Sequence, residues 1–215
     1  MIANSEIGLE VELTTRCTIG CVACPRHRDW ENRQIWNAGF IELDTIKAIL
    51  RNTDYAKYHF VGAYGDAIYH PHFIEIIKYA IDLGKKFFVE TNGAHRNEEF
   101  WDKVAALPFV KGRHIWHFSI DGLEDTNHIY RQNSKWSTIM YAVKALHTAK
   151  HRPYLSWKYI VFSYNAHQVD EAEKFSKEIG FNEFRPVKSL RNYHPGLFKD
   201  ESEHRQIDWD FSEVS

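Results

Sequence analysis

Cysteine is scarce in this sequence of 215 residues, which has only three: Cys17, Cys21 and Cys24. All three lie within one short segment, and an odd, clustered set of this kind argues against a disulfide framework. No cysteine follows Cys24, so no auxiliary cysteine-ligated cluster is expected later in this sequence. The three thiols therefore point to a metal site or to catalysis in a reducing compartment.

Long apolar runs and a large excess of charge are also absent. No stretch approaches the roughly 18 apolar residues of a membrane span. The first six residues show neither the basic start nor the apolar run of a secretory signal. The formal net charge is only −2, which gives no electrostatic reason to expect nucleic acid or a membrane surface. We therefore predict a cytoplasmic protein that has neither as a partner.

Hydrophobic and aromatic residues, in contrast, are plentiful. They make up 44% and 15% of the sequence, which is enough for a packed core, and the length suits one domain. We predict that residues 1–187 form this domain and that residues 188–215 form a C-terminal tail. The stretch 185–199 is basic, which suits an anionic substrate or a solvated surface, whereas the rest of the tail is acidic and typical of a solvated segment.

Segments typical of strands alternate with segments typical of helices. Runs of β-branched and aromatic residues predict strands at 9–14, 58–62, 86–91, 115–121, 155–162 and 183–186. Capping residues and helical spacing predict helices at 44–50, 71–84, 97–107, 136–150 and 165–179. Such alternation predicts an α/β fold with a parallel sheet and right-handed crossovers.

Six strand–helix units suit a partial (β/α)6 barrel with parallel strands, or an open doubly wound sheet. A full eight-unit barrel usually needs about 250 residues, and we expect the partial barrel. In either architecture ligands bind at the carboxyl ends of the strands. The motifs described next all fall at such ends, which predicts a single active site.

The three cysteines come directly after the first predicted strand. Thiolates are natural ligands of iron–sulfur clusters, and three of them leave one iron of a [4Fe–4S] cluster open for another ligand. Zinc is the competing metal, because three cysteines and a histidine form a known zinc site, and His27 is near in sequence. The spacing alone leaves both metals open.

The pattern C-x3-C-x2-C after a first strand resembles the hallmark of the radical S-adenosylmethionine (SAM) superfamily, which Cys17, Cys21 and Cys24 match position for position. The resemblance implies that these cysteines hold a [4Fe–4S] cluster and that SAM chelates the open iron through its amino and carboxylate groups. One electron would then cleave SAM to methionine and a 5′-deoxyadenosyl radical, which removes hydrogen from a substrate. Ala23 stands where the family often has an aromatic residue near adenine.

Two further strand ends carry segments similar to SAM-binding motifs of this family. The segment 61–67 resembles the Gly-Gly-Glu-Pro segment, with Gly65 retained and Asp66 in place of the glutamate that binds the SAM amino group. Asn92 lies in a Thr-Asn-Gly turn after the third strand and is a candidate SAM contact. Its alternative role is that of a plain turn residue, since Asn-Gly is a frequent turn pair for steric reasons.

The fourth strand ends in Ser-Ile-Asp-Gly, which resembles the peptide-modifying and sulfatase-maturating members of the family. The resemblance implies that Ser119 contacts the SAM carboxylate or ribose and that Asp121 lies close by. Arg131 is a candidate partner for the SAM carboxylate, because a planar guanidinium suits bidentate recognition. A surface ion pair with Glu124 or Asp125 is the alternative for Arg131.

The fifth strand contains Lys158 and leads into Asn165. The family commonly has an asparagine at the position of Asn165, with neighbouring backbone near adenine, and capping of the next helix is a compatible second role. A charged residue inside a strand is unusual. We expect Lys158 to face solvent rather than to line the active site.

These motifs together predict a minimal radical SAM enzyme, an oxidoreductase or transferase, with a [4Fe–4S] cluster and SAM as cofactors. The implied partners are a reductant such as flavodoxin or ferredoxin and a substrate that is either a peptide or a small metabolite. The alternative is an iron–sulfur or zinc protein that binds a partner without SAM chemistry. The motifs at the second, fourth and fifth strand ends favour the enzyme, since a simple metal module would not need them.

Overall fold

The computed structural model describes residues 7–26 and 39–188. Six strands form one parallel sheet, in the order β1 (Gly8–Val11), β3 (Lys57–Phe60), β4 (Phe87–Thr91), β5 (His114–Ser119), β7 (Tyr154–Val161) and β8 (Glu183–Lys188). All six strands predicted from the sequence are confirmed, with ends shifted by a few residues, which is the usual uncertainty of element boundaries. Lys188, the first residue of the predicted tail, ends β8, and the rest of that tail and His27 lie outside the described residues.

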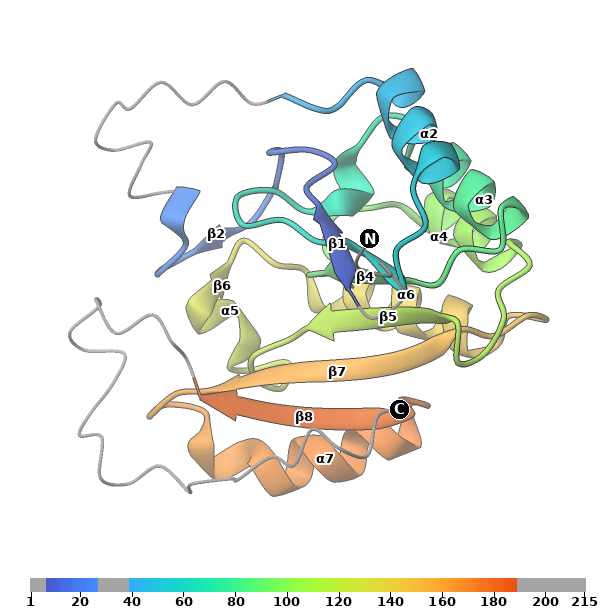
Figure 1. Cartoon of the computed structure of the whole chain (residues 1–215). Helices are drawn as coiled ribbons and strands as arrows, with labels where there is room; N and C mark the ends of the chain where they lie inside the picture. The colour runs from blue at the N-terminus through green and yellow to red at the C-terminus, as the bar shows by residue number, and fades with distance from the viewer. Residues whose placement is uncertain (1–6, 27–38, 189–215) are drawn as a thin grey trace.

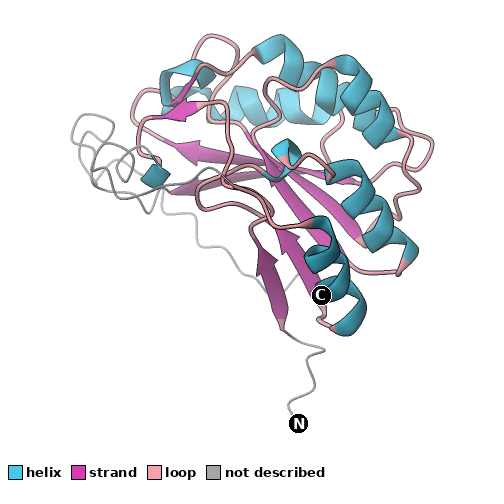
Figure 2. Ribbon diagram, turned by 90° about the horizontal axis from the view of Figure 1, so that it is seen from above, coloured by secondary structure: helices cyan, strands magenta, loops and turns pink. Residues whose placement is uncertain are grey.

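The order of these strands decides between the two predicted architectures. A doubly wound sheet needs a point at which the strand order reverses, and within the described residues the order in the sheet follows the order in the chain. Right-handed crossovers then place the connecting helices on one face, and Figure 2 shows helices along the outer side of the curved sheet. The fold is the partial (β/α) barrel, and the doubly wound alternative is wrong.

The principal helices are α2 (Leu43–Asn52), α3 (Phe73–Asp82), α4 (Glu98–Ala105), α6 (Trp136–His147) and α7 (Val169–Glu178). A short helix, α5 (Asn127–Tyr130), and two 3-10 turns, η2 (Ala67–Tyr69) and η3 (Ala166–Gln168), lie in the connections. The cap predicted for α4 is confirmed, because the Asn97 side chain accepts a hydrogen bond from the Phe100 amide at 3.0 Å. No helix in the described ranges is long and apolar enough to cross a bilayer.

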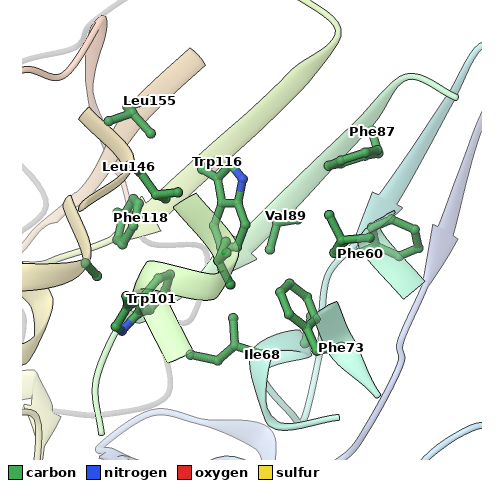
Figure 3. Packing of buried hydrophobic residues seen from close by; sticks show 14 of the residues in the cluster. Phe60, Ile68, Phe73, Phe87, Val89, Trp101, Trp116, Phe118, Leu146 and Leu155 are labelled. Atoms are coloured by element: carbon green, nitrogen blue, oxygen red, sulfur yellow. The ribbon is translucent and has the colours of Figure 1, made fainter. Parts of the chain in front are cut away.

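The core lies between the sheet and these helices and is rich in aromatic rings (Figure 3). Alternate residues of a strand face opposite sides, so Phe87 and Val89 of β4 are buried in this core. Trp101 of α4 packs edge-on against Trp116 of β5, with ring centroids 5.8 Å apart. The helices thus fix one face of the sheet and leave the carboxyl ends of the strands and the concave face for a site.

A second, two-stranded sheet was not predicted. β2 (Gly20–Cys21) pairs antiparallel with β6 (Arg131–Gln132), which places Cys21 opposite Arg131. In Figure 1 both strands lie on the side to which the arrowheads of β5 and β8 point. The cysteine segment is therefore fastened over the carboxyl ends of the main sheet.

Candidate functional site

A cavity of about 440 Å³ opens at the carboxyl ends of the strands. Small-molecule sites commonly have about 300–1,000 Å³. Of the site residues that the sequence predicts, the cavity wall contains Cys17, Cys21, Cys24, Gly65, Asp66, Asn92, Ser119 and Arg131. The other two, Asp121 and Asn165, have no exposed surface; Asp121 pairs with Arg131, and Asn165 donates to the Asp121 carbonyl. The motifs scattered along the sequence thus meet at one place.

The cysteine segment is held in a compact loop by its own backbone and by Arg26. The Cys24 amide donates to the Cys21 carbonyl at 3.0 Å. The Arg26 guanidinium donates to the carbonyls of Cys17, at 2.6 Å, and of Ile19. The three thiols are half-buried and none is in a disulfide, in agreement with the sequence prediction.

Burial disfavours the thiolate form of these cysteines. It raises the pKa of the Cys17 thiol, and the nearby Asp66 carboxylate adds to the rise. Burial also raises the pKa of Cys21 to about 12, against the opposing charge of Arg131. Metal binding requires thiolates, so a bound cationic metal group would supply the charge that stabilises them here.

The donor set fits an iron–sulfur cluster. Three thiols line one cavity, and three thiolates leave one iron of a cubane open. Within the described residues, no three His, Cys, Asp or Glu side chains form a group that could hold a single metal ion. The histidine that the zinc alternative would use, His27, lies outside those residues.

The loop after β3 comes very close to the chain after β1. A Cβ atom at Gly65 would lie 1.8 Å from the Thr14 carbonyl oxygen, so only glycine fits. The Glu12 carboxylate accepts hydrogen bonds from the amides of Tyr64 and Gly65, both at 2.9 Å. Nothing in the sequence pattern singles out Glu12, which lies within the first predicted strand.

Asp66 points towards the turn after β4. Its Oδ2 accepts from Thr91 Oγ1 at 3.0 Å, from the Asn92 amide nitrogen at 2.8 Å and from Asn92 Nδ2 at 2.5 Å. Its Oδ1 accepts from the Ile68 amide at 3.3 Å. Burial raises the pKa of Asp66 to about 6, although these hydrogen bonds favour the ionised form. The carboxylate therefore organises the neighbouring turn, and a direct contact with the SAM amino group stays a prediction.

Arg131 is buried, and its guanidinium Nε lies 2.7 Å from Oδ2 of Asp121. The predicted alternative, a surface pair with Glu124 or Asp125, is wrong, because the β2–β6 pairing draws Arg131 inward. Burial alone would lower the pKa of Arg131, but the Asp121 charge outweighs it and raises that pKa. Nη1 of the same guanidinium lies 4.0 Å from Sγ of Cys21.

Asn165 ties together the ends of two strands and does not cap a helix with its side chain. Its Nδ2 donates to the carbonyls of Asp121 and Ile160, both at 2.9 Å, and its Oδ1 accepts from the Phe162 amide at 2.7 Å. The helix α7 begins at Val169, after the 3-10 turn η3. The predicted capping role is therefore wrong, and a position near adenine stays a prediction.

The floor of the cavity carries an ion pair that sequence reasoning missed. Glu90 and Lys158 both line the cavity, with Nζ of Lys158 2.9 Å from Oε1 of Glu90. The hydroxyl of Ser119 donates to the same oxygen at 3.1 Å. The expectation that Lys158 faces solvent is wrong. Alternation along β4 could have indicated Glu90, which lies between the buried Val89 and Thr91.

Ala23 is buried in a small cluster with Tyr130 and Phe162. The rings of Tyr130 and Phe162 are 4.6 Å apart, and Tyr130 also lines the cavity. Ala23 stands where the family that this sequence resembles often has an aromatic residue, and the ring of Tyr130 packs beside that position. Aromatic surface is therefore present at the cavity wall, although it comes from α5.

Comparison with known proteins gives a family match and several relatives. The family described as the Radical SAM superfamily matches residues 11–176. A curated relative from Pyrococcus furiosus, a tungsten-containing aldehyde ferredoxin oxidoreductase cofactor-modifying protein, is 22% identical over 181 residues, which cover 80% of this chain and 48% of the relative.

Two solved structures are similar in fold. The structure of anSMEcpe with bound AdoMet has a TM-score of 0.64 and 16% identity, over 86% of this chain and 52% of that chain. Streptococcus suis SuiB bound to precursor peptide SuiA has a TM-score of 0.67 and 14% identity, over 86% of this chain and 40% of that chain. The chain therefore spans about half the length of these relatives.

Proposed function

We propose that this chain, which belongs to the radical SAM superfamily, holds a [4Fe–4S] cluster at its three cysteines and uses it with SAM to start radical chemistry on a substrate. The family uses these two cofactors, and together they supply the one-electron cleavage of SAM into methionine and a 5′-deoxyadenosyl radical that takes a hydrogen atom from the substrate. The electron comes from a reductant, for which we propose a flavodoxin or a ferredoxin.

One observation carries the proposal: the three thiols share a single cavity with the segments that resemble SAM-binding motifs. Together with the cysteines they come from four separate strand ends, those of β1, β3, β4 and β5, and their convergence supports a common ligand. A metal-binding module without SAM chemistry would not require Asn92, Ser119 or Arg131 in the wall beside its cysteines. The cavity volume of about 440 Å³ is also in the range of a site for a small molecule.

The roles of the protein groups follow from their surroundings. The cysteines would bind iron as thiolates, and Arg131 would offset part of their negative charge because it lies beside Cys21. Asp121 holds the Arg131 guanidinium at 2.7 Å, so that the remaining N–H groups are oriented for an anionic partner such as the SAM carboxylate. The close approach at Gly65 lets the loop after β3 meet a ligand through its backbone.

For the substrate we propose a peptide, with a small metabolite as the alternative. The cavity must hold SAM and the reacting group of the substrate together, and its volume leaves room for only a small part of a larger molecule. Insertion of one residue from a peptide meets that condition. The similarity of the fold to SuiB, whose structure contains a precursor peptide, supports the same choice.

The test is anaerobic reconstitution followed by chemical analysis. We expect about four irons and four sulfides per chain and, with SAM and a strong reductant, slow release of 5′-deoxyadenosine without any substrate. Alanine at any one of the three cysteine positions should abolish both the cluster and the product. Ser119→Ala should reduce product formation less, because it removes one positioning contact among several.

Two results would contradict this function. Stoichiometric zinc with sulfur ligands and no uptake of iron would favour the zinc-protein alternative. An intact, reduced cluster that neither yields 5′-deoxyadenosine nor changes its electron paramagnetic resonance (EPR) spectrum when SAM is added would favour an iron–sulfur protein without SAM chemistry.

A further inference from the structure

The side-chain amide of Asn92 lies between two acidic groups, the Asp66 carboxylate and the Cys17 thiol. Nδ2 of Asn92 is 2.5 Å from Oδ2 of Asp66 and 3.5 Å from Sγ of Cys17. An asparagine amide has two N–H donors, so one can serve the carboxylate and the other the sulfur. Oδ1 accepts from the Ala94 amide at 2.8 Å, which fixes the orientation with the NH₂ group towards both acids.

Contacts on both sides hold this arrangement in place. Gly93 has a φ of +69°, and a Cβ there would lie 3.0 Å from the Phe118 ring, so the turn that presents Asn92 is closely constrained. On the cysteine side, Thr18 Oγ1 is hydrogen-bonded to the Tyr69 hydroxyl at 2.7 Å and to Nδ1 of His95 at 2.9 Å. The residue that follows Cys17 is thereby fastened to the segment that follows Asn92.

We propose that Asn92 raises the reduction potential of the cluster by donating a hydrogen bond to the sulfur of Cys17. The inference rests on the proposed function, since it requires a cluster at the cysteines. Reduction adds negative charge to the cluster and its sulfur ligands, and an N–H donor stabilises the more negative state. Hydrogen bonds to the sulfurs are among the factors that set the potential of such clusters.

The nearby Asp66 carboxylate increases the effect of this hydrogen bond on the reduction potential. It repels a negative charge on Cys17, and the NH₂ group of Asn92 is the donor that stands between them. Loss of the amide would remove a favourable contact and leave the repulsion unscreened, so both effects would lower the potential. In an enzyme of this class, the potential decides how readily a biological reductant can supply the electron.

The test compares two substitutions in the same turn. Asn92→Leu keeps a side chain of similar size but removes both donors. Thr91→Val is the matched control, because it removes hydrogen bonds to Asp66 and to the Gly93 amide without touching a sulfur. Wild type and variants are reconstituted anaerobically, iron and sulfide are counted, and the reduced cluster is followed by EPR in a potentiometric titration without SAM.

In Asn92→Leu we expect the ratio of reduced to oxidised cluster at a fixed potential to fall about tenfold, which for one electron is a shift of about 59 mV to more negative values. Thr91→Val should titrate like the wild type, because the sulfur contact is intact. A wild-type potential in Asn92→Leu, or an equal shift in Thr91→Val, would overturn the proposal.

A second variant keeps the proposal testable if Asn92→Leu takes up no cluster. Asn92→Ala also removes both N–H donors and adds no charge beside Asp66, so its potential should also be lower than that of the wild type. If both variants fold, by far-ultraviolet circular dichroism, yet hold no cluster, Asn92 serves to retain the cluster and the tuning role is refuted. A wild type without any cluster would overturn the proposed function as well, whereas an unchanged potential refutes only this inference.

Discussion

Nζ of Lys158 lies 2.9 Å from Oε1 of Glu90, although their strands, β7 and β4, are separated in the sheet by β5. The two side chains are 38% and 34% exposed, so the pair stands in the cavity wall and not in a dry core. Ser119 of β5 donates to the same carboxylate oxygen. The three side chains therefore connect three neighbouring strands beneath the site.

The ion pair predicts a dependence of stability on pH. Burial alone would raise the pKa of Glu90, but the charge of Lys158 and its hydrogen bond outweigh burial and hold that pKa below its usual value. A carboxylate with a lowered folded pKa stabilises the fold above its unfolded pKa, and this stabilisation is lost as the pH falls through the folded value. Lys158→Met should therefore cost about 1 kcal/mol at neutral pH, because the pair is partly screened by solvent.

The same substitution should cost less at acid pH, because protonation of Glu90 in the wild type removes the charge that Lys158 pairs with. Urea unfolding at both pH values measures the difference. Lys177→Met is the control, because its partner Glu173 lies one helical turn away on an exposed surface, and exposed pairs of this kind contribute little. An equal loss for Lys158→Met at both pH values would refute the argument.

Substitution in the buried pair of Arg131 and Asp121 should lower the free energy of unfolding by more than Lys158→Met does. Their side chains are only 10% and 0% exposed, so Arg131→Met leaves an ionised carboxyl without a partner charge. Breaking a buried pair in this way costs about 3–5 kcal/mol. Adding Asp121→Asn to the same chain removes the orphaned charge and should recover part of the loss. Urea unfolding of the single and double variants tests this, and a double variant no more stable than Arg131→Met would argue against it.

We expect substitution of Gly65 to cause a steric clash in the loop after β3. In Gly65→Ala the new methyl group would meet the Thr14 carbonyl oxygen, at 1.8 Å, and backbone cannot yield as a flexible side chain does. We expect a loss of about 1–3 kcal/mol in the free energy of unfolding, together with weaker SAM binding. Gly8→Ala is the control, since the nearest atom there, 3.2 Å away, belongs to the flexible Lys57 side chain. Equal melting temperatures for the two variants would contradict the steric argument.

We expect substitution of Asp66 to weaken SAM binding while the cluster is retained. Asp66→Ala removes the acceptor that holds the turn at Asn92 and, by resemblance to the family, the acid that binds the SAM amino group. A charge-assisted hydrogen bond contributes about 1.5–3 kcal/mol, so affinity should fall about ten- to a hundredfold. Asp66→Asn keeps one acceptor oxygen and should lose less. Equilibrium dialysis with labelled SAM, alongside iron counts, measures both, and unchanged affinity in Asp66→Ala would mean that the alignment to the family's glutamate is wrong.

Much of this site was predictable because its signals are local. The spacing of Cys17, Cys21 and Cys24 and the Thr-Asn-Gly turn at Asn92 are short segments whose chemistry can be read directly. Parallel strands bring their carboxyl ends to one edge, so segments after successive strands were expected to meet. The segments after β1, β3, β4 and β5 do line one cavity, whereas Asn165, after β7, has no exposed surface.

The errors concern side chains whose environment depends on distant segments. Lys158 was expected in solvent, but the curvature of the sheet brings it to Glu90 across β5. A surface ion pair was the alternative predicted for Arg131, but the antiparallel pairing of β6 with β2 buries Arg131 against Asp121. Helix capping was offered as a second role for Asn165, but its side-chain amide donates to carbonyls that follow β5 and end β7.

The sequence by itself determined the six parallel strands and the three-thiol motif, because strand patterns and ligand spacing are properties of consecutive residues. Only the tertiary structure decided which partner each polar side chain takes. Glu12 supports the loop at Gly65, and Asn92 reaches the sulfur of Cys17, over separations of 53 and 75 residues. Such contacts depend on how the strands and loops pack against one another, and no local pattern in the sequence shows which distant residues will meet.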